Sequence, residues 1–159
     1  MEHRISSGAL VLRDERILLV RHRLEGEYDY WAPPGGGVED DEELEAAAAR
    51  EVFEEAGIRA QMLSLAYIDE LIDHYGRMIK FWYIAQYLSG EITLELNPAV
   101  EESIVDAGWF AHATLPKEHV FPVLLRDQFW KDLGSGFQHP RKLPLQHSIF
   151  QLKSGLAEE

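Results

Sequence analysis

Residues 36 to 58 read GGVEDDEELEAAAAREVFEEAGI, and this stretch decides how the chain is expected to fold. Residues that favour helices run from Glu42 to Ala56, and Asp40 or Asp41 stands before them as a candidate cap. Gly57 suits the end of a helix because glycine adopts the left-handed backbone found there. The apolar residues recur at helical spacing and predict one buried face: Leu44, Ala47, Ala48 and Val52.

Three glutamates of this predicted helix, Glu51, Glu54 and Glu55, lie three or four positions apart or side by side. Positions i, i+3 and i+4 share a helix face, so these carboxylates project into one small volume and repel each other. Taken alone, such a cluster is an ordinary solvated face. Clustered carboxylate oxygens also suit Mg²⁺ or Mn²⁺, which would cancel the repulsion.

The segments around this helix read mostly as strands. Apolar runs rich in β-branched and aromatic residues predict two strands within 5–23, then strands at 59–73, 78–90 and 103–110. The Gly- and Pro-rich segment 24–37 predicts a loop, and 121–133 an amphipathic helix. This order indicates an α/β fold with a mixed sheet covered by helices. We expect one domain over 1–133 and a tail, extended or partly disordered, over 134–159.

Composition restricts the compartment and the partners. The chain has no cysteine, which excludes disulfides and thiolate metal sites. Its N-terminus lacks the layout of a signal peptide, and no apolar run approaches the roughly 18 residues of a membrane span, so a cytoplasmic protein without a membrane partner is expected. The net charge of −13 repels polymeric nucleic acid, because binding it requires clustered Lys and Arg. A small anionic ligand stays possible where local cations or a metal offset the charge.

The spacing of the quoted stretch closely resembles a known motif. Gly36, Glu42, the Arg50-Glu51-Val52 triplet, the Glu54-Glu55 pair and the Gly57-Ile58 pair match every fixed position of the Nudix box, the signature of the Nudix hydrolases. The flanking sequences WAPPGGGVE and AGWF also resemble that family, so the resemblance spans about residues 5 to 133. It implies the Nudix fold, a mixed β-sheet sandwiched between helices in an α/β/α arrangement.

The resemblance also implies roles for individual residues. The metal ligands would be the carbonyl of Gly35 and the carboxylates of Glu51, Glu54 and Glu55, and the metal would be Mg²⁺ or Mn²⁺. Arg50 would orient a neighbouring glutamate. Many members use a further glutamate outside the box as a base or an extra ligand, and the candidates here are Glu101 and Glu102.

The implied activity is hydrolysis of a pyrophosphate bond in a nucleoside diphosphate linked to another moiety, X. The substrate could be a dinucleoside polyphosphate, a nucleoside triphosphate or a nucleotide sugar. Tyr75 lies at the distance past the box where dinucleoside polyphosphate hydrolases carry a tyrosine. The alternative is a non-catalytic Nudix-fold module that senses a nucleotide, although such modules commonly lose box glutamates that this chain keeps.

Two features outside the box bear on chemistry and assembly. Pro33 replaces the leucine that usually precedes Pro-Gly-Gly in the family, which removes no metal ligand. Many relatives form homodimers, and the aromatic residues of the C-terminal segment could either contribute to such an interface or fold back onto their own domain: Phe129, Trp130, Phe137 and Phe150.

Overall fold

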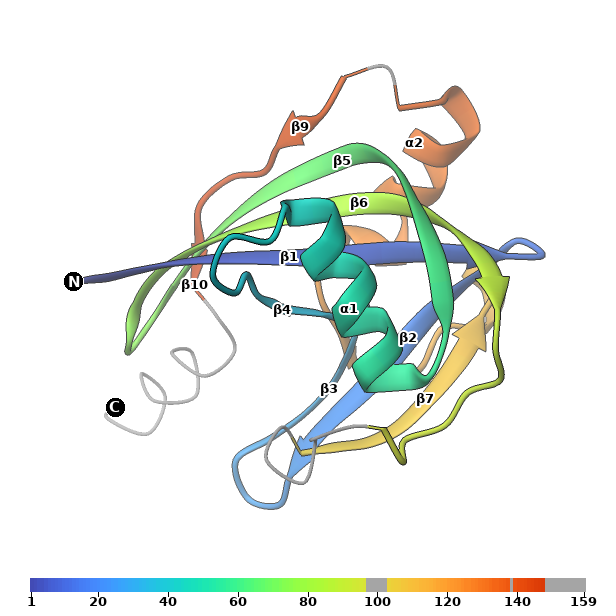
Figure 1. Ribbon diagram of the computed structural model, residues 1–159, viewed down its shortest axis with the longest axis horizontal. Coiled ribbons are helices and arrows are strands. Elements are labelled where there is room, and N and C mark those ends of the chain that lie inside the picture. Colours follow the sequence, from blue (N-terminus) through green and yellow to red (C-terminus); the bar gives the residue numbers. More distant parts are fainter. Residues whose placement is uncertain (97–102, 138, 148–159) are drawn as a thin grey trace.

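The computed structural model describes residues 1–96, 103–137 and 139–147, and in this part of the chain ten strands form one mixed sheet (Figure 1). Strands β10, β5, β6, β1, β2, β3 and β8 follow one another across the sheet, while β4 pairs with β1, β7 with β2 and β9 with β5. The strands are β1 (Glu2–Arg13), β2 (Arg16–Leu24), β3 (Tyr28–Ala32), β4 (Gly35–Gly37), β5 (Arg59–Asp73), β6 (Gly76–Ser89), β7 (Ile104–Phe110), β8 (His119–Val120), β9 (Arg141–Lys142) and β10 (Gln146–His147).

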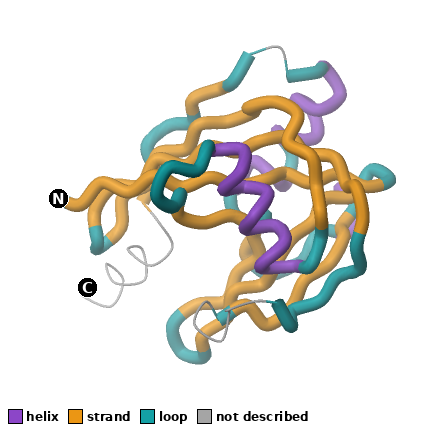
Figure 2. The backbone as a smooth tube through the Cα atoms, in the orientation of Figure 1, coloured by secondary structure: helices purple, strands orange, loops and turns teal. Residues whose placement is uncertain are grey.

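Helices cover both faces of this sheet (Figures 1 and 2). Helix α1 (Leu44–Ala56) packs on one face, where Ala48 and Val52 join a cluster of buried strand residues. On the other face lie the two short 3-10 helices η1 (His112–Thr114) and η2 (Val123–Arg126), and helix α2 (Gln128–Ser135). The core of this second face includes Leu125 of η2 and Phe129 of α2. The predicted layering of a mixed sheet between helices is confirmed.

Alternation along the central strands explains why one sheet can have two cores. In β1, Ala9 and Val11 belong to the cluster under α1, while Leu10 belongs to the cluster under α2. In β2, Leu18 belongs to the cluster under α1 and Leu19 to the cluster under α2. Successive side chains of a strand point to opposite faces, so these uninterrupted apolar runs bury both faces at once.

The long helix begins two residues later than the sequence predicts, and it begins differently. The capping role expected of Asp40 or Asp41 is wrong, because Glu43 precedes the helix and makes no side-chain capping bond. At the other end the prediction is confirmed. Gly57 adopts the left-handed backbone (φ 74°), and its N–H donates to the carbonyl of Phe53 at 2.9 Å.

The predicted loop at 24–37 contains two short strands. Strand β3 pairs antiparallel with β2, and β4 pairs antiparallel with β1. The glycines of β4 lie close to β1, since a methyl group on Gly35 would stand 2.8 Å from Cα of Gly8. Glycine and proline usually indicate turns, but here glycine permits an approach that larger residues would block.

The C-terminal region differs from the single helix predicted over 121–133. Asp127 has non-helical backbone angles (φ −143°, ψ −57°) and separates η2 from α2. Phe129 is fully buried, and Trp130 and Phe137 pack against the same cluster, so these three aromatic residues fold back onto their own domain. Phe150 lies outside the described residues. The homodimer stays a prediction.

Beyond α2 the chain returns to the sheet along the outer side of β5 (Figure 1). The 141–142 and 146–147 segments both pair with β5 in parallel. The domain boundary at residue 133 stays a prediction. None of the helices in the described ranges combines the length and the apolar character needed to cross a membrane.

Replacing Gly57 with alanine is expected to destabilise the protein by about 1–2 kcal/mol, the usual cost of a left-handed backbone with a Cβ atom. The added methyl group would also stand 2.4 Å from Cγ2 of Thr93. Gly134 of α2 is the matched control, because a Cβ there meets nothing within 4 Å. Urea unfolding of Gly57→Ala and Gly134→Ala measures the difference. Equal stabilities of the two variants would contradict this account of the helix end.

Candidate active site

The three-glycine strand β4 is the platform on which the site is built. It pairs with Ser6, Ser7 and Gly8 of β1. The hydroxyl of Ser6 donates a hydrogen bond to the carbonyl of Gly36 at 2.8 Å. Gly35 and Gly36, which have no side chain, are therefore held in a fixed position facing the helix that follows them in the chain.

Two of the three predicted glutamates face this platform from α1 and are buried. Glu51 is 5% exposed and Glu55 is 1% exposed. The backbone N–H of Gly35 donates to Oε1 of Glu55 at 3.2 Å. A methyl group on Gly36 would stand 2.5 Å from Oε1 of Glu51, so this carboxylate occupies the space that a side chain at position 36 would need.

The third glutamate, Glu54, is held at the edge of the site by Arg50. Its side chain is 35% exposed, and its Oε2 accepts a hydrogen bond from Nη1 of Arg50 at 3.2 Å. The same Nη1 atom donates to Oε1 of Glu51 at 3.0 Å, while Nη2 donates to the carbonyl of Gly37 at 3.0 Å and to Oε1 of Glu42 at 2.7 Å. One planar guanidinium thus fastens the helix to the glycine strand, a geometry that a lysine cannot reproduce.

A second cation, Lys80 of β6, reaches the glycine strand from the sheet. A methyl group on Gly35 would stand 2.9 Å from Nζ of Lys80. Burial lowers the pKa of Lys80, while the nearby charges of Glu55, Asp69 and Glu51 favour its protonated form. The ammonium group lies 4.3 Å from the ring centre of Trp82, close enough for a cation–π contact.

The donor groups at this site fit a divalent cation. Carboxylates and a backbone carbonyl are hard oxygen ligands of the kind that Mg²⁺ and Mn²⁺ prefer. The two buried carboxylates lie against glycine backbone, so Gly35 and Gly36 themselves add no side chain between the carboxylates and an ion. Within the described ranges, no three acidic or histidine side chains already stand in a geometry that would hold a metal. Arg50 instead bridges Glu51 and Glu54 at this place, and the Lys80 side chain lies beside Gly35.

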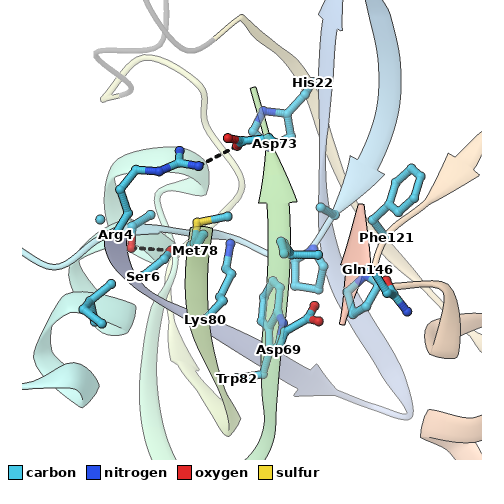
Figure 3. Close-up of a pocket in the computed structure, with 18 of the residues that line it drawn as sticks. Arg4, Ser6, His22, Asp69, Asp73, Met78, Lys80, Trp82, Phe121 and Gln146 are labelled. Atoms are coloured by element: carbon cyan, nitrogen blue, oxygen red, sulfur yellow. Dashed lines mark hydrogen bonds and ion pairs between the residues drawn. The ribbon is translucent and has the colours of Figure 1, made fainter. Parts of the chain in front are cut away.

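A cavity of about 570 Å³ opens beside the glycine strand (Figure 3). Lys80 and Asp69 are register partners on β6 and β5, and both side chains line the cavity. Burial raises the pKa of Asp69. Arg4 donates to Asp73 at 2.5 Å, and both residues line the cavity (Figure 3). Aromatic side chains supply much of the remaining wall: Tyr30, Trp82, Phe121 and His22.

Other sequence predictions have different outcomes. Glu101 and Glu102, the candidate base or extra ligand, lie outside the described residues. Tyr75 is 62% exposed and does not line the cavity, although its ring lies 5.7 Å from the guanidinium of Arg4, which does.

The sequence reasoning missed Lys80 and Asp69. A local signal for Lys80 was present. Trp82 and Ile84 are buried, and Lys80 precedes them by two and four positions on the same strand. Alternation along the strand therefore places this charged residue on the buried face. Asp69 follows the buried Tyr67 by two positions and so lies on the same face of β5. Their position opposite one another depends on strand register, which no local pattern reveals.

The comparisons with known proteins agree with this geometry. A profile of the NUDIX domain matches residues 2–127. The NAD-capped RNA hydrolase NudC of Escherichia coli (strain SMS-3-5 / SECEC) is 32% identical over 108 residues, which cover 67% of this chain. The chain spans only 38% of the length of this relative.

Solved structures show the same likeness. The crystal structure of a MutT NUDIX hydrolase from Burkholderia pseudomallei is 28% identical with a TM-score of 0.66, covering 79% of this chain and 96% of that chain. A NUDIX hydrolase from Nitrosomonas europaea shares the fold with a TM-score of 0.68 at 24% identity, covering 87% of this chain and 93% of that chain.

The Arg50–Glu42 contact predicts a pH dependence. Hydrogen bonds from Arg50 lower the pKa of Glu42 below its ordinary value of 4.5. Because the folded pKa is the lower one, the stabilisation is complete above about pH 4.5 and is lost as the pH falls through the folded pKa. Wild type should therefore exceed Glu42→Gln in stability at pH 7, and the difference should shrink towards pH 3.

Urea unfolding at a series of pH values measures this difference. Glu43→Gln is the control, because Glu43 is exposed and makes no capping bond. A wild-type advantage over Glu42→Gln that stays constant or grows on acidification would contradict the assignment.

Proposed function

The chain belongs to the Nudix hydrolase family, and from this membership we propose that it is a Mg²⁺- or Mn²⁺-dependent nucleotide pyrophosphohydrolase. Water would add to one phosphorus of a nucleoside diphosphate linked to X, and the bridging P–O bond would break. The products would be a nucleoside monophosphate and phosphorylated X. The observation that carries the proposal is the pair of buried carboxylates, Glu51 and Glu55, held against a glycine strand that also lines a cavity.

The metal would be held by Glu51, Glu54, Glu55 and the carbonyl of Gly35. When bound, such an ion neutralises phosphate oxygens and lowers the pKa of water. Arg50 positions Glu51 and Glu54 through its hydrogen bonds to both. Glu101 or Glu102 remains the proposed base or extra ligand.

Lys80 supports the choice of a diphosphate substrate. Its ammonium lies beside Gly35 and at the cavity wall, so a phosphate entering from the cavity would meet a positive charge next to the carboxylates. Charge-assisted contacts of this kind are stronger than neutral hydrogen bonds. The proposal thus places the diphosphate at the glycine strand and the attached nucleoside in the cavity.

The substrate class is the finer part of the proposal. Dinucleoside polyphosphates, nucleoside triphosphates and nucleotide sugars all carry a nucleoside and a pyrophosphate bond. The cavity volume of about 570 Å³ is typical of small-molecule sites. The net charge of −13 favours a small substrate over polymeric nucleic acid, even though the relative NudC is named for NAD-capped RNA.

Replacing Glu55 with glutamine is expected to reduce turnover by about two decades or more while the fold stays intact, because a charged oxygen ligand becomes a neutral isostere. Glu45→Gln, an exposed change in the first turn of the same helix, is the control. Product formation is measured over a panel of the three substrate classes with Mg²⁺, with Mn²⁺ and with a chelator.

Wild type and Glu45→Gln should hydrolyse at least one member of the panel, and the chelator should stop both. A near-normal rate for Glu55→Gln, or turnover that persists with the chelator, would contradict the proposal. Nucleotide binding without any turnover by wild type would favour the sensing module instead.

A further inference from the structure

The C-terminal arm, residues 141–147, forms part of the cavity wall although it lies beyond the matched NUDIX domain at 2–127. Gln146 and His147 of β10 line the cavity that also reaches Lys80 and the glycine strand. Figure 3 shows Gln146, Phe121, Asp69 and Lys80 among the residues that line this cavity. A segment outside the family domain therefore contributes to the site where the proposed substrate would bind.

The arm is held on the sheet by its backbone and by a buried side chain. The N–H of Leu143 donates to the carbonyl of Ile68 at 2.8 Å, and the Leu143 side chain is 6% exposed in the core under α2. Further along, Gln146 pairs in register with Leu71 of β5. Because both attachments are to the same strand, the register of the arm decides which of its residues meets the cavity.

Charged contacts strengthen the beginning of the arm. Nζ of Lys142 lies 2.7 Å from Oε1 of Glu70, and Arg141 lies 3.1 Å from Oδ1 of Asp132. Asp132 also accepts a hydrogen bond of 2.5 Å from the hydroxyl of Tyr67, a side chain 1% exposed. The arm is thus fastened to both β5 and α2, and its position at the cavity is built into the fold.

The chemistry of the cavity wall suits a flat heteroaromatic group. Tyr30 and Phe121, which both line the cavity, meet edge to face with ring centres 5.7 Å apart. Among the described residues, none hydrogen-bonds the side-chain amide of Gln146. An amide offers both a donor and an acceptor, and the carboxylate of Asp69 offers an acceptor in the same cavity.

We propose that the C-terminal arm is a specificity element, in which the Gln146 amide binds the hydrogen-bonding edge of the substrate's nucleobase. The inference rests on the proposed function for the identity of the ligand. The phosphates would lie at the Lys80 side, where Nζ of Lys80 lies beside the glycine strand. Aromatic surfaces bind any base, so discrimination between bases falls to polar groups such as this amide.

The test changes the hydrogen-bonding character of residue 146 without changing its shape. Gln146→Glu replaces the amide donor with an acceptor, and Leu145→Ala is the control because Leu145 is 49% exposed on the same arm and does not line the cavity. The probes are the non-hydrolysable α,β-methylene diphosphates of adenosine, guanosine, cytidine and uridine. Their dissociation constants are measured by calorimetry with Mg²⁺, alongside thermal melting of each variant.

Wild type should prefer some bases over others, and Gln146→Glu should change the ratio of two dissociation constants by about tenfold or more. Leu145→Ala should keep the wild-type ratios within about twofold. A wild type without base preference, or a Gln146→Glu protein with unchanged ratios and unchanged melting, would overturn the inference. If Gln146→Glu does not fold, Gln146→Leu is measured against the same criteria.

Hydrolysis of the substrate panel by wild type separates the two proposals. Turnover together with ratios that do not depend on residue 146 would overturn the role of the arm and leave the hydrolase standing. Base-selective binding that depends on Gln146, without turnover, would overturn the hydrolase and support the arm. Failure to bind any of the four nucleotides, together with no turnover of the substrate panel, would overturn both.

Discussion

The structure depends on placing two buried carboxylates, Glu51 and Glu55, against a strand made of glycine. Burying a carboxylate is costly unless hydrogen bonds or opposite charges compensate it. The N–H of Gly35, the guanidinium of Arg50 and the nearby ammonium of Lys80 provide that compensation. The same arrangement requires glycine at position 36, because a side chain there would occupy the place of the Glu51 carboxylate. The fold thus keeps negative charge concentrated beside open backbone, where a cation could replace or join the side-chain cations.

The sheet connects this charge to a space large enough for a nucleoside. On the face under α2, Tyr67 of β5 belongs to the core, while Asp69, Leu71 and Asp73 of the same strand line the cavity. One strand therefore passes from packed core to ligand-accessible wall within a few residues. Its outer side is also where the C-terminal arm pairs, so the strand that lines the cavity positions Gln146 as well.

Local sequence patterns correctly predicted the elements that have a strong hydrophobic periodicity or a residue that marks their end. The strands at 59–73 and 78–90 were predicted within about two residues, and Gly57 ends the helix as its lack of a side chain suggests. The high glycine content led to the wrong prediction of a loop at β4, because a strand of glycines has the composition of a turn. The approach of Lys80 to the glycine strand and the pairing of the arm with β5 join distant segments, and their register is decided by the packed sheet.

Anomalous diffraction from crystals containing Mn²⁺ and a non-hydrolysable nucleotide tests the central claim most directly. The account predicts an Mn²⁺ ion bound through oxygen ligands at about 2.0–2.2 Å from the carboxylates of Glu51, Glu54 and Glu55 and the carbonyl of Gly35, with the nucleotide phosphates beside it. An ion located away from these groups, or a nucleotide bound without any ion at the glycine strand, would contradict it.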